Sequence, residues 1–174
     1  MNFRVTVVET YVSPDNLNVD SILARYDTSC SEIENVLKSH TFHQYTNQAF
    51  EIALHEQLGE LFTSFFWEKG ITIYSGGYSP RINFMPDVAI GSPIDDKRIY
   101  IEIEFGHNEF EDIVKFQIGY KNHLELGVLM VAKNGEVINR RHTMMPNFKK
   151  CRDILVALEP DCPILLIGFD GKWD

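Results

Sequence analysis

Residues 86–105 read PDVAIGSPIDDKRIYIEIEF, two short apolar runs joined by a segment rich in turn-forming residues. In the second run, Ile101, Ile103 and Phe105 alternate with two glutamates. Successive side chains of a strand point to opposite faces of a sheet, so this run predicts a strand with one apolar and one acidic face. The Gly, Ser, Pro and Asp residues between the runs favour a chain reversal. We therefore predict an antiparallel pair of strands.

The expected pairing brings acidic side chains together. We take Ile90 to pair with Ile99 across the turn. Asp87 then lies directly opposite Glu102, with the two Cβ atoms about 5 Å apart on the same face. Glu104 shares this face because it lies two residues further along the strand. Mg²⁺ takes oxygen ligands and commonly combines one or two carboxylates with waters and a substrate phosphate. The pairing thus predicts a magnesium site.

Such a site suits phosphodiester cleavage. A bound cation polarises a phosphoryl oxygen and lowers the pKa of an attacking water. Carboxylates packed together without a cation raise one another's pKa, and a metal relieves that repulsion. The alternative interpretation is a solvated polar face on an amphipathic strand, and a register slip of one residue would remove the site. The position of Asp87 after a proline, one strand earlier, favours the metal site.

The rest of the chain alternates strand-like and helix-like segments, which predicts an α/β fold with helices on both faces of a central mixed sheet. We expect strands at residues 3–12, 71–74, 83–90, 98–105, 127–132 and 163–169. We expect helices at residues 19–39 with a break near 27–31, and at 46–69, 109–124 and 144–158. In the helix at 109–124, the apolar pattern predicts inward positions for Phe110, Ile113, Val114, Ile118 and Leu124.

Length and composition narrow the class of protein. A chain of 174 residues fits one domain, and we expect residues 1–174 to form it. Its apolar runs are shorter than the roughly 18 residues that predict a membrane span, and the first residues resemble a strand rather than a signal peptide. The three cysteines have irregular spacing, which favours a cytoplasmic protein with reduced thiols.

The net charge of −9 counts against a simple nucleic-acid binder, which usually has a basic balance. It is compatible with a nuclease, which needs acids at its metal site and a local basic surface elsewhere. The alternative for each basic group is an ordinary solvated charge. The candidates for the basic surface are Lys97 and Arg98, Arg140 and Arg141, and Lys149, Lys150 and Arg152.

The acidic motif resembles that of the PD-(D/E)xK nuclease superfamily. It consists of Pro86-Asp87, fourteen intervening residues and Glu102-Ile103-Glu104. Glu104 stands where most members have lysine, a variant that resembles the BamHI and BglII group of type II restriction endonucleases. Residues 101–133 resemble that group's catalytic strand, next helix and next strand, and residues 162–169 resemble a late core strand. The resemblance implies a restriction-endonuclease-like α/β/α sandwich.

The resemblance also implies roles for the acidic residues. Asp87 and Glu102 would be metal ligands, and the backbone carbonyl of Ile103 would be a third. Glu104 would orient or deprotonate the attacking water. The cofactor would be Mg²⁺, and the single domain would be a nuclease domain.

Members of this superfamily often add a glutamate from the first core helix. Glu56 and Glu60 both qualify, because they lie four residues apart on one helix face. We favour Glu56 as the further catalytic residue, and the alternative for either is a solvated helix residue. His107 is a candidate for contact with the scissile phosphate or for a proton relay, and we favour a surface or helix-capping role. Lys115 would reach the site or, as we favour, lie on a solvated face.

The implied function is a Mg²⁺-dependent endonuclease of a restriction-modification system, a homodimer that cuts double-stranded DNA at a short palindromic site. One alternative is a non-specific or repair nuclease of the same fold, and another is a nuclease-fold protein that binds DNA without cleaving it. The short loops leave little room for the recognition arms of longer family members. Residues 75–82, 91–97 and 133–145 are the candidates for base contacts, the last with Arg140, Arg141 and His142.

Overall fold

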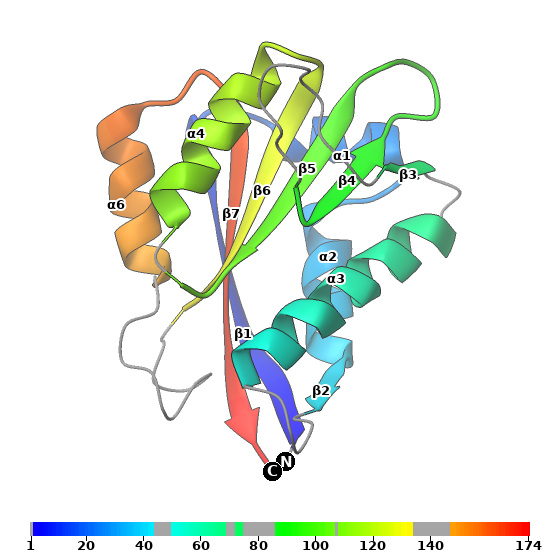
Figure 1. Ribbon diagram of the computed structural model, residues 1–174, viewed down its shortest axis with the longest axis vertical. Helices are drawn as coiled ribbons and strands as arrows, with labels where there is room; N and C mark the ends of the chain where they lie inside the picture. Colours follow the sequence, from blue (N-terminus) through cyan, green and yellow to red (C-terminus); the bar gives the residue numbers. More distant parts are fainter. Residues whose placement is uncertain (1, 44–49, 69–71, 75–85, 107, 134–146) are drawn as a thin grey trace.

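The computed structural model describes residues 2–43, 50–68, 72–74, 86–106, 108–133 and 147–174. In this part of the chain the strands form one mixed sheet with the order β2-β1-β7-β6-β5-β4-β3 (Figure 1). The strands are β1 (Asn2–Ser13), β2 (Thr41–His43), β3 (Thr72–Tyr74), β4 (Val88–Gly91), β5 (Arg98–Glu104), β6 (Leu124–Ala132) and β7 (Ile164–Trp173). The helices are α1 (Val19–Leu23), the 3-10 helix η1 (Ala24–Tyr26), α2 (Cys30–Ser39), α3 (Phe50–Glu68), α4 (Glu109–Tyr120) and α6 (Phe148–Leu158).

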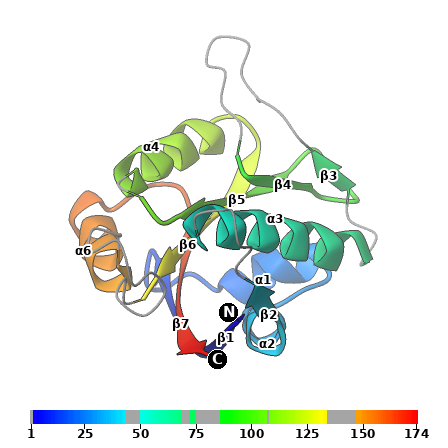
Figure 2. The same cartoon turned by 60° about the horizontal axis from the view of Figure 1, so that its bottom comes forward.

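Helices cover both faces of the sheet. Helices α1, α2 and α3 lie on one face, and α4 and α6 lie on the other (Figures 1 and 2). Two apolar clusters correspond to these faces. Ile99, Ile101 and Ile103 of β5 join the cluster that includes α2 and α3, whereas Tyr100 joins the cluster that includes α4 and α6. Strands β5, β6 and β7 run parallel, and their neighbours pair antiparallel. The α/β/α sandwich and its mixed sheet are confirmed.

The register of β4 against β5 is the one predicted. Ile90 pairs with Ile99, and Val88 pairs with Ile101. Side chains alternate along β5, and its odd-numbered isoleucines face α3. Glu102 and Glu104 therefore point towards the face that α4 and α6 cover.

Two glycines let the helices of that face approach the sheet closely. A Cβ atom at Gly127 of β6 would lie 2.5 Å from the ring of Phe116 in α4. A Cβ atom at Gly168 of β7 would lie 2.4 Å from the ring of Phe148 in α6. Each phenylalanine thus packs directly on backbone, and α4 lies close enough for its polar side chains to reach the end of β5.

Helix α4 differs from the prediction in length and in orientation. It ends at Tyr120, and Leu124 already belongs to β6. Phe110 and Val114, predicted to face inward, are 54% and 40% exposed. Phe116 packs on Gly127 of β6, and the helix face that contains Phe116 also carries Asp112 and Glu109 towards the sheet. The buried residues of α4 are Glu109, Asp112, Ile113, Phe116 and Gly119.

The predicted break in the segment 19–39 is confirmed. Asp27 has a φ of 54°, which ends η1, and Ser29 then caps α2 by accepting a hydrogen bond of 3.2 Å from the Glu32 N–H. Strand β2 was not predicted. Among the described residues, no helix is long and apolar enough to cross a membrane. The predicted segments at 46–49, 83–85 and 144–146 lie outside the described residues.

Candidate active site

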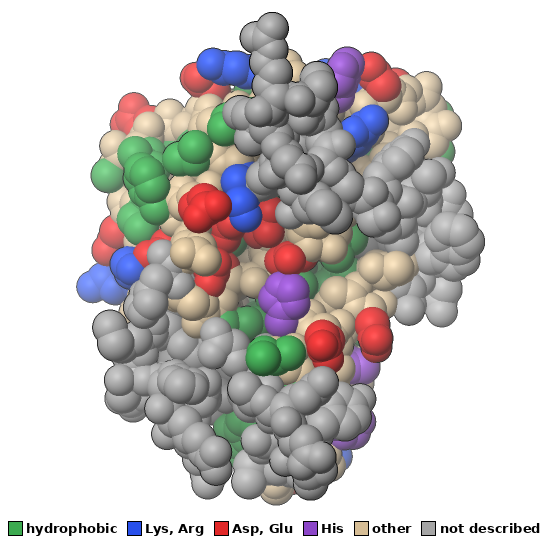
Figure 3. Space-filling model, in the orientation of Figure 1, with side chains coloured by type: hydrophobic (Ala, Val, Ile, Leu, Met, Phe, Trp, Pro, Cys, Tyr) green, Lys and Arg blue, Asp and Glu red, His purple; other side chains and the backbone are tan. Residues whose placement is uncertain are grey.

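Acidic side chains gather at the end of β5, between α4 and α3 (Figure 3). Asp87 lies just before the first residue of β4, beyond the point where the pairing of β4 with β5 ends. Its Oδ2 accepts a hydrogen bond of 2.8 Å from the backbone N–H of Ile103. The carboxylate is therefore held against the edge of β5 by backbone geometry, and a change of register would remove this contact.

Glu102 is the most enclosed carboxylate of the predicted motif. It is only 4% exposed, and its side chain is hydrogen-bonded to that of Asp87. Its Oε1 atom is buried without a hydrogen-bond partner and lies 3.7 Å from Nζ of Lys115. The side chains of Asp87 and Glu102 are thus in contact, as the predicted strand pairing requires.

Glu104 lies two residues further along β5 and is half-buried. Its Oε1 accepts a hydrogen bond from the backbone N–H of Gly106. A Cβ atom at position 106 would lie 2.9 Å from this oxygen, so glycine permits the close approach. On its other side, the Glu104 carboxyl is hydrogen-bonded to Asp112 of α4.

Two residues of α4 complete this side of the cluster. Asp112 is 3% exposed, and its Oδ1 accepts a hydrogen bond of 2.9 Å from Nζ of Lys115. Lys115 follows Asp112 by three residues, which puts both side chains on one helix face. Lys115 was expected on a solvated face. That expectation is wrong because the rotation of α4 turns its side chain towards Glu102.

From the other face of the sheet, α3 contributes His55. Its Nε2 lies 3.1 Å from Oδ1 of Asp87. Sequence reasoning missed this residue, because it sought a glutamate on this helix. Glu56 and Glu60 are both exposed. Helix α3 therefore lies beside Asp87, and the residue that contacts Asp87 is His55, which precedes Glu56 in the chain.

The environment separates the pKa values of these carboxyls. Burial, together with the nearby charges of Asp112 and Asp87, raises the pKa of Glu102 to about 9. Burial raises the pKa of Glu104 to about 7, although the Gly106 N–H opposes the shift. Burial also acts to raise the pKa of Asp87, but hydrogen bonds from His55 and Ile103 outweigh it and hold this pKa below its usual value.

At neutral pH, Glu102 therefore carries a proton that it shares with the Asp87 carboxylate. Burial raises the pKa of Asp112 as well, while Lys115 opposes the shift. The hydrogen bond to Asp87 raises the pKa of His55 above its ordinary value. The cluster is thus an acidic site in which protons and basic side chains moderate the repulsion between carboxylates.

The other predicted candidates lie away from this cluster or outside the described residues. Of the expected basic groups, Lys150 pairs with the buried Glu109 at the start of α4. In the segment 91–97, Asp95 pairs with Arg25. Lys97, Arg98, Lys149 and Arg152 are described, and Arg152 pairs with Asp153. The candidates that lie outside the described residues are His107, Arg140, Arg141 and His142, and the segments 75–82 and 134–145.

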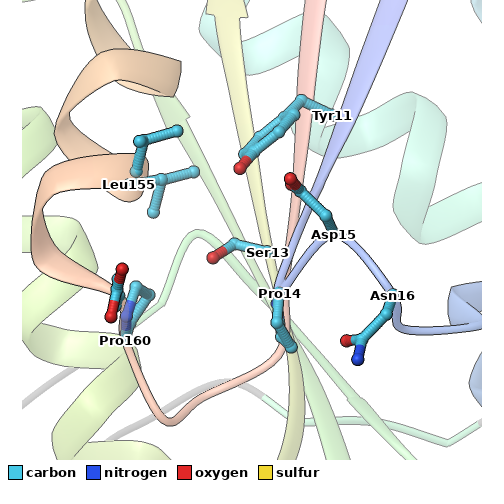
Figure 4. Close-up of a pocket in the computed structure, with 9 residues that line it drawn as sticks. Tyr11, Ser13, Pro14, Asp15, Asn16, Leu155 and Pro160 are labelled. Carbon is cyan, nitrogen blue, oxygen red and sulfur yellow. The ribbon is translucent and has the colours of Figure 1, made fainter.

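A separate pocket lies between the end of β1 and the end of α6 (Figure 4). It is lined by Tyr11, Ser13 and Asp15 on one side and by Leu155 and Pro160 on the other. Ser13 pairs with Ile164, the first residue of β7, whereas Glu104 lies at the last residue of β5. The pocket is therefore near the opposite end of the parallel strands and takes no part in the acidic site.

A mixed sheet lies between two layers of helices, and carboxyls are in contact where β4 begins and β5 ends, which is the architecture expected of the restriction-endonuclease-like fold. The family model described as restriction endonuclease BglII/BglIII matches residues 15–169. The chain belongs to this family and is accordingly a DNA endonuclease of the type II restriction class. A comparison with curated proteins finds no match. The family resemblance predicted from the acidic motif is confirmed.

Proposed function

We propose that the protein is a Mg²⁺-dependent type II restriction endonuclease that cuts double-stranded DNA at a short palindromic site. The observation that carries the metal dependence is the contact between the carboxyls of Asp87 and Glu102 at the end of β5. Family membership supplies the DNA substrate. The carboxyl pair gives a physical reason for a cation: Glu102 is buried and in contact with the carboxyl of Asp87, and a divalent ion can take the place of the proton between them.

The donor set fits a hard cation. Every candidate ligand is an oxygen, which Mg²⁺ prefers, and Oε1 of Glu102 is buried without a hydrogen-bond partner. In the described part of the chain, no three His, Cys, Asp or Glu side chains yet converge as a formed metal site. The carboxylates outnumber the basic side chains, which leaves negative charge for a divalent ion to balance. The cluster consists of Asp87, Glu102, Glu104 and Asp112 with Lys115 and His55.

We assign unequal roles to the residues. Asp87 and Glu102 would hold the metal, with the backbone carbonyl of Ile103 as a third ligand. The metal, when bound, polarises the phosphate and lowers the pKa of a coordinated water. Glu104 would orient this water and accept its proton, since a carboxyl with a pKa of about 7 is suited to proton transfer near neutral pH. The water oxygen would bond to phosphorus as one phosphodiester P–O bond breaks, and the sugar oxygen that leaves would take up a proton from solvent.

On α3, His55 has better support as a member of the site than Glu56 or Glu60. Its imidazole contacts Asp87, whereas both glutamates are exposed. Glu56 stays a candidate for a catalytic role, and its exchange for glutamine tests that role.

We propose further that residues 1–174 act as one nuclease domain and that two copies form a homodimer. Paired cuts in the two strands of a palindrome require two active sites related by a two-fold axis. We place the protein in the cytoplasm, because Cys30, Cys151 and Cys162 are all free thiols.

The pattern of cleavage tests this function. Supercoiled plasmid DNA is incubated with the protein and Mg²⁺, and parallel reactions contain EDTA. We expect discrete fragments with Mg²⁺ and intact plasmid with EDTA. A smear would support a non-specific nuclease, and intact DNA in Mg²⁺ across many plasmid sequences would support a binding protein. Either result would overturn the proposal.

A further inference from the structure

The carboxylates of the acidic site repel the negatively charged phosphates of DNA. Asp87, Glu102, Glu104 and Asp112 lie together at the end of β5, where the proposed function requires a DNA phosphate to bind. A phosphate 4 Å from a carboxylate is repelled by about 1 kcal/mol in water and by about 4 kcal/mol at an effective dielectric constant of 20. A divalent ion offsets part of this repulsion. The acidic motif itself supplies no cationic side chain, because position 104 is glutamate.

Helix α4 places a positively charged side chain, that of Lys115, beside the carboxyls at the end of β5. Nζ of Lys115 lies 3.7 Å from Oε1 of Glu102 and donates a hydrogen bond of 2.9 Å to Asp112. The Lys115 side chain remains 24% exposed, whereas those of Glu102 and Asp112 are 5% and 4% exposed. The ammonium group is thus at the boundary between the buried carboxyls and the solvent.

The position of this ammonium group follows from the packing of α4. Phe116 lies directly on Gly127, which brings the helix close to the sheet. Lys115 is next to Phe116 in the chain, and Asp112 is one turn before it on the same face as Lys115. Asp112 is buried and is also hydrogen-bonded to Glu104, so it is a fixed anchor for the flexible lysine.

We propose that Lys115 is a catalytic residue that contacts the scissile phosphate and stabilises the negative charge that its non-bridging oxygens gain during cleavage. Asp112 is its positioning residue. This inference rests on the proposed nuclease function and assigns a role that the acidic motif does not contain. Lysine and arginine contacts with a reacting phosphoryl group act where charge develops, and loss of one such donor typically costs about 10²- to 10³-fold in rate.

A purely structural role makes a different prediction. If Lys115 served only to hold Glu102 and Asp112 in place, its removal would disorder the metal ligands. Cation binding and cleavage would then weaken together. If Lys115 acts on the phosphate, removal of its positive charge leaves the carboxyls in place and removes a cation that repels a bound metal ion. Divalent cations would then bind at least as tightly while cleavage slows.

The test compares the variants Lys115→Met and Lys115→Arg with the control Lys121→Met. Lys121 is an exposed lysine at the end of α4. Single-turnover cleavage of plasmid DNA is measured with saturating Mg²⁺, and binding of Ca²⁺ alone is measured by calorimetry without DNA. For Lys115→Met we expect a rate at least 100-fold lower and a Ca²⁺ affinity equal to or above that of the wild type. Lys115→Arg should recover part of the rate, and Lys121→Met should match the wild type in both measurements.

The outcomes separate this inference from the proposed function. If wild-type protein fails to cleave with Mg²⁺, the function itself is wrong. If the wild type cleaves and Lys115→Met cleaves at a similar rate, only the role of Lys115 is overturned. A parallel loss of Ca²⁺ affinity and rate in folded Lys115→Met also overturns it, in favour of a structural role.

Discussion

Replacement of Glu102 by glutamine should stabilise the metal-free protein. The Glu102 carboxyl has a pKa of about 9 in the fold against an ordinary value of 4.5, because it is buried beside Asp112 and Asp87. Between these two values the folded protein holds a proton that the unfolded chain has released. The free energy of unfolding therefore falls as pH rises from about 4.5 to about 9, by about 1.4 kcal/mol per pH unit from this group. At pH 7 the loss amounts to about 3 kcal/mol.

Glutamine has the shape of the protonated acid and does not titrate, so Glu102→Gln removes this loss. Urea unfolding followed by circular dichroism in EDTA measures the effect at pH 5, 7 and 8. We expect the variant to be more stable by about 3 kcal/mol at pH 7, by more at pH 8 and by little near pH 5. Glu111→Gln, an exposed change on α4, should behave as the wild type. A difference that is absent at pH 7, or that does not grow with pH, would refute the electrostatic account of the cluster.

One pH profile and two variants test other parts of the structure. Ca²⁺ affinity, measured by calorimetry, should rise about tenfold per pH unit between pH 7 and pH 8.5, because the ion must displace the proton of Glu102; a flat profile would contradict this. His55→Ala should lower the affinity for Ca²⁺ or the cleavage rate about 10- to 100-fold, because Asp87 loses a partner that orients it; unchanged values of both would remove His55 from the site. Gly127→Ala should lower the unfolding free energy by about 1–3 kcal/mol, since the new methyl group collides with Phe116; a neutral result would show that α4 can shift.

The sequence was sufficient for the part of the site that depends on strand geometry. An antiparallel pair centred on the loop 91–97, with Ile90 opposite Ile99, was the condition of the site prediction, and this register is observed. The contact between Asp87 and Glu102 follows from that register. These features are local in the chain and repeat with a period of two, so they can be predicted without tertiary information.

The contributions of the helices were not predictable in the same way. Apolar periodicity favoured burial of Phe110 in α4, yet that residue is exposed and Asp112 is buried. The rule failed because the packing of Phe116 on Gly127 sets the face that α4 turns to the sheet, and Asp112 lies on that face one turn before Phe116. On α3, the choice of Glu56 over His55 rested on residue type, and the helix pattern alone does not say which side chain reaches Asp87.

The central claim is that Asp87 and Glu102 hold the cation with which the protein cuts DNA. The most direct test is single-turnover cleavage of plasmid DNA with Mg²⁺ by Asp87→Asn, with Glu111→Gln as a matched loss of one negative charge. Asparagine at position 87 retains the shape of the side chain and removes the charge that a cation requires. We predict that Asp87→Asn lacks detectable cleavage while Glu111→Gln cleaves at the wild-type rate. Cleavage by Asp87→Asn at the wild-type rate would contradict the claim.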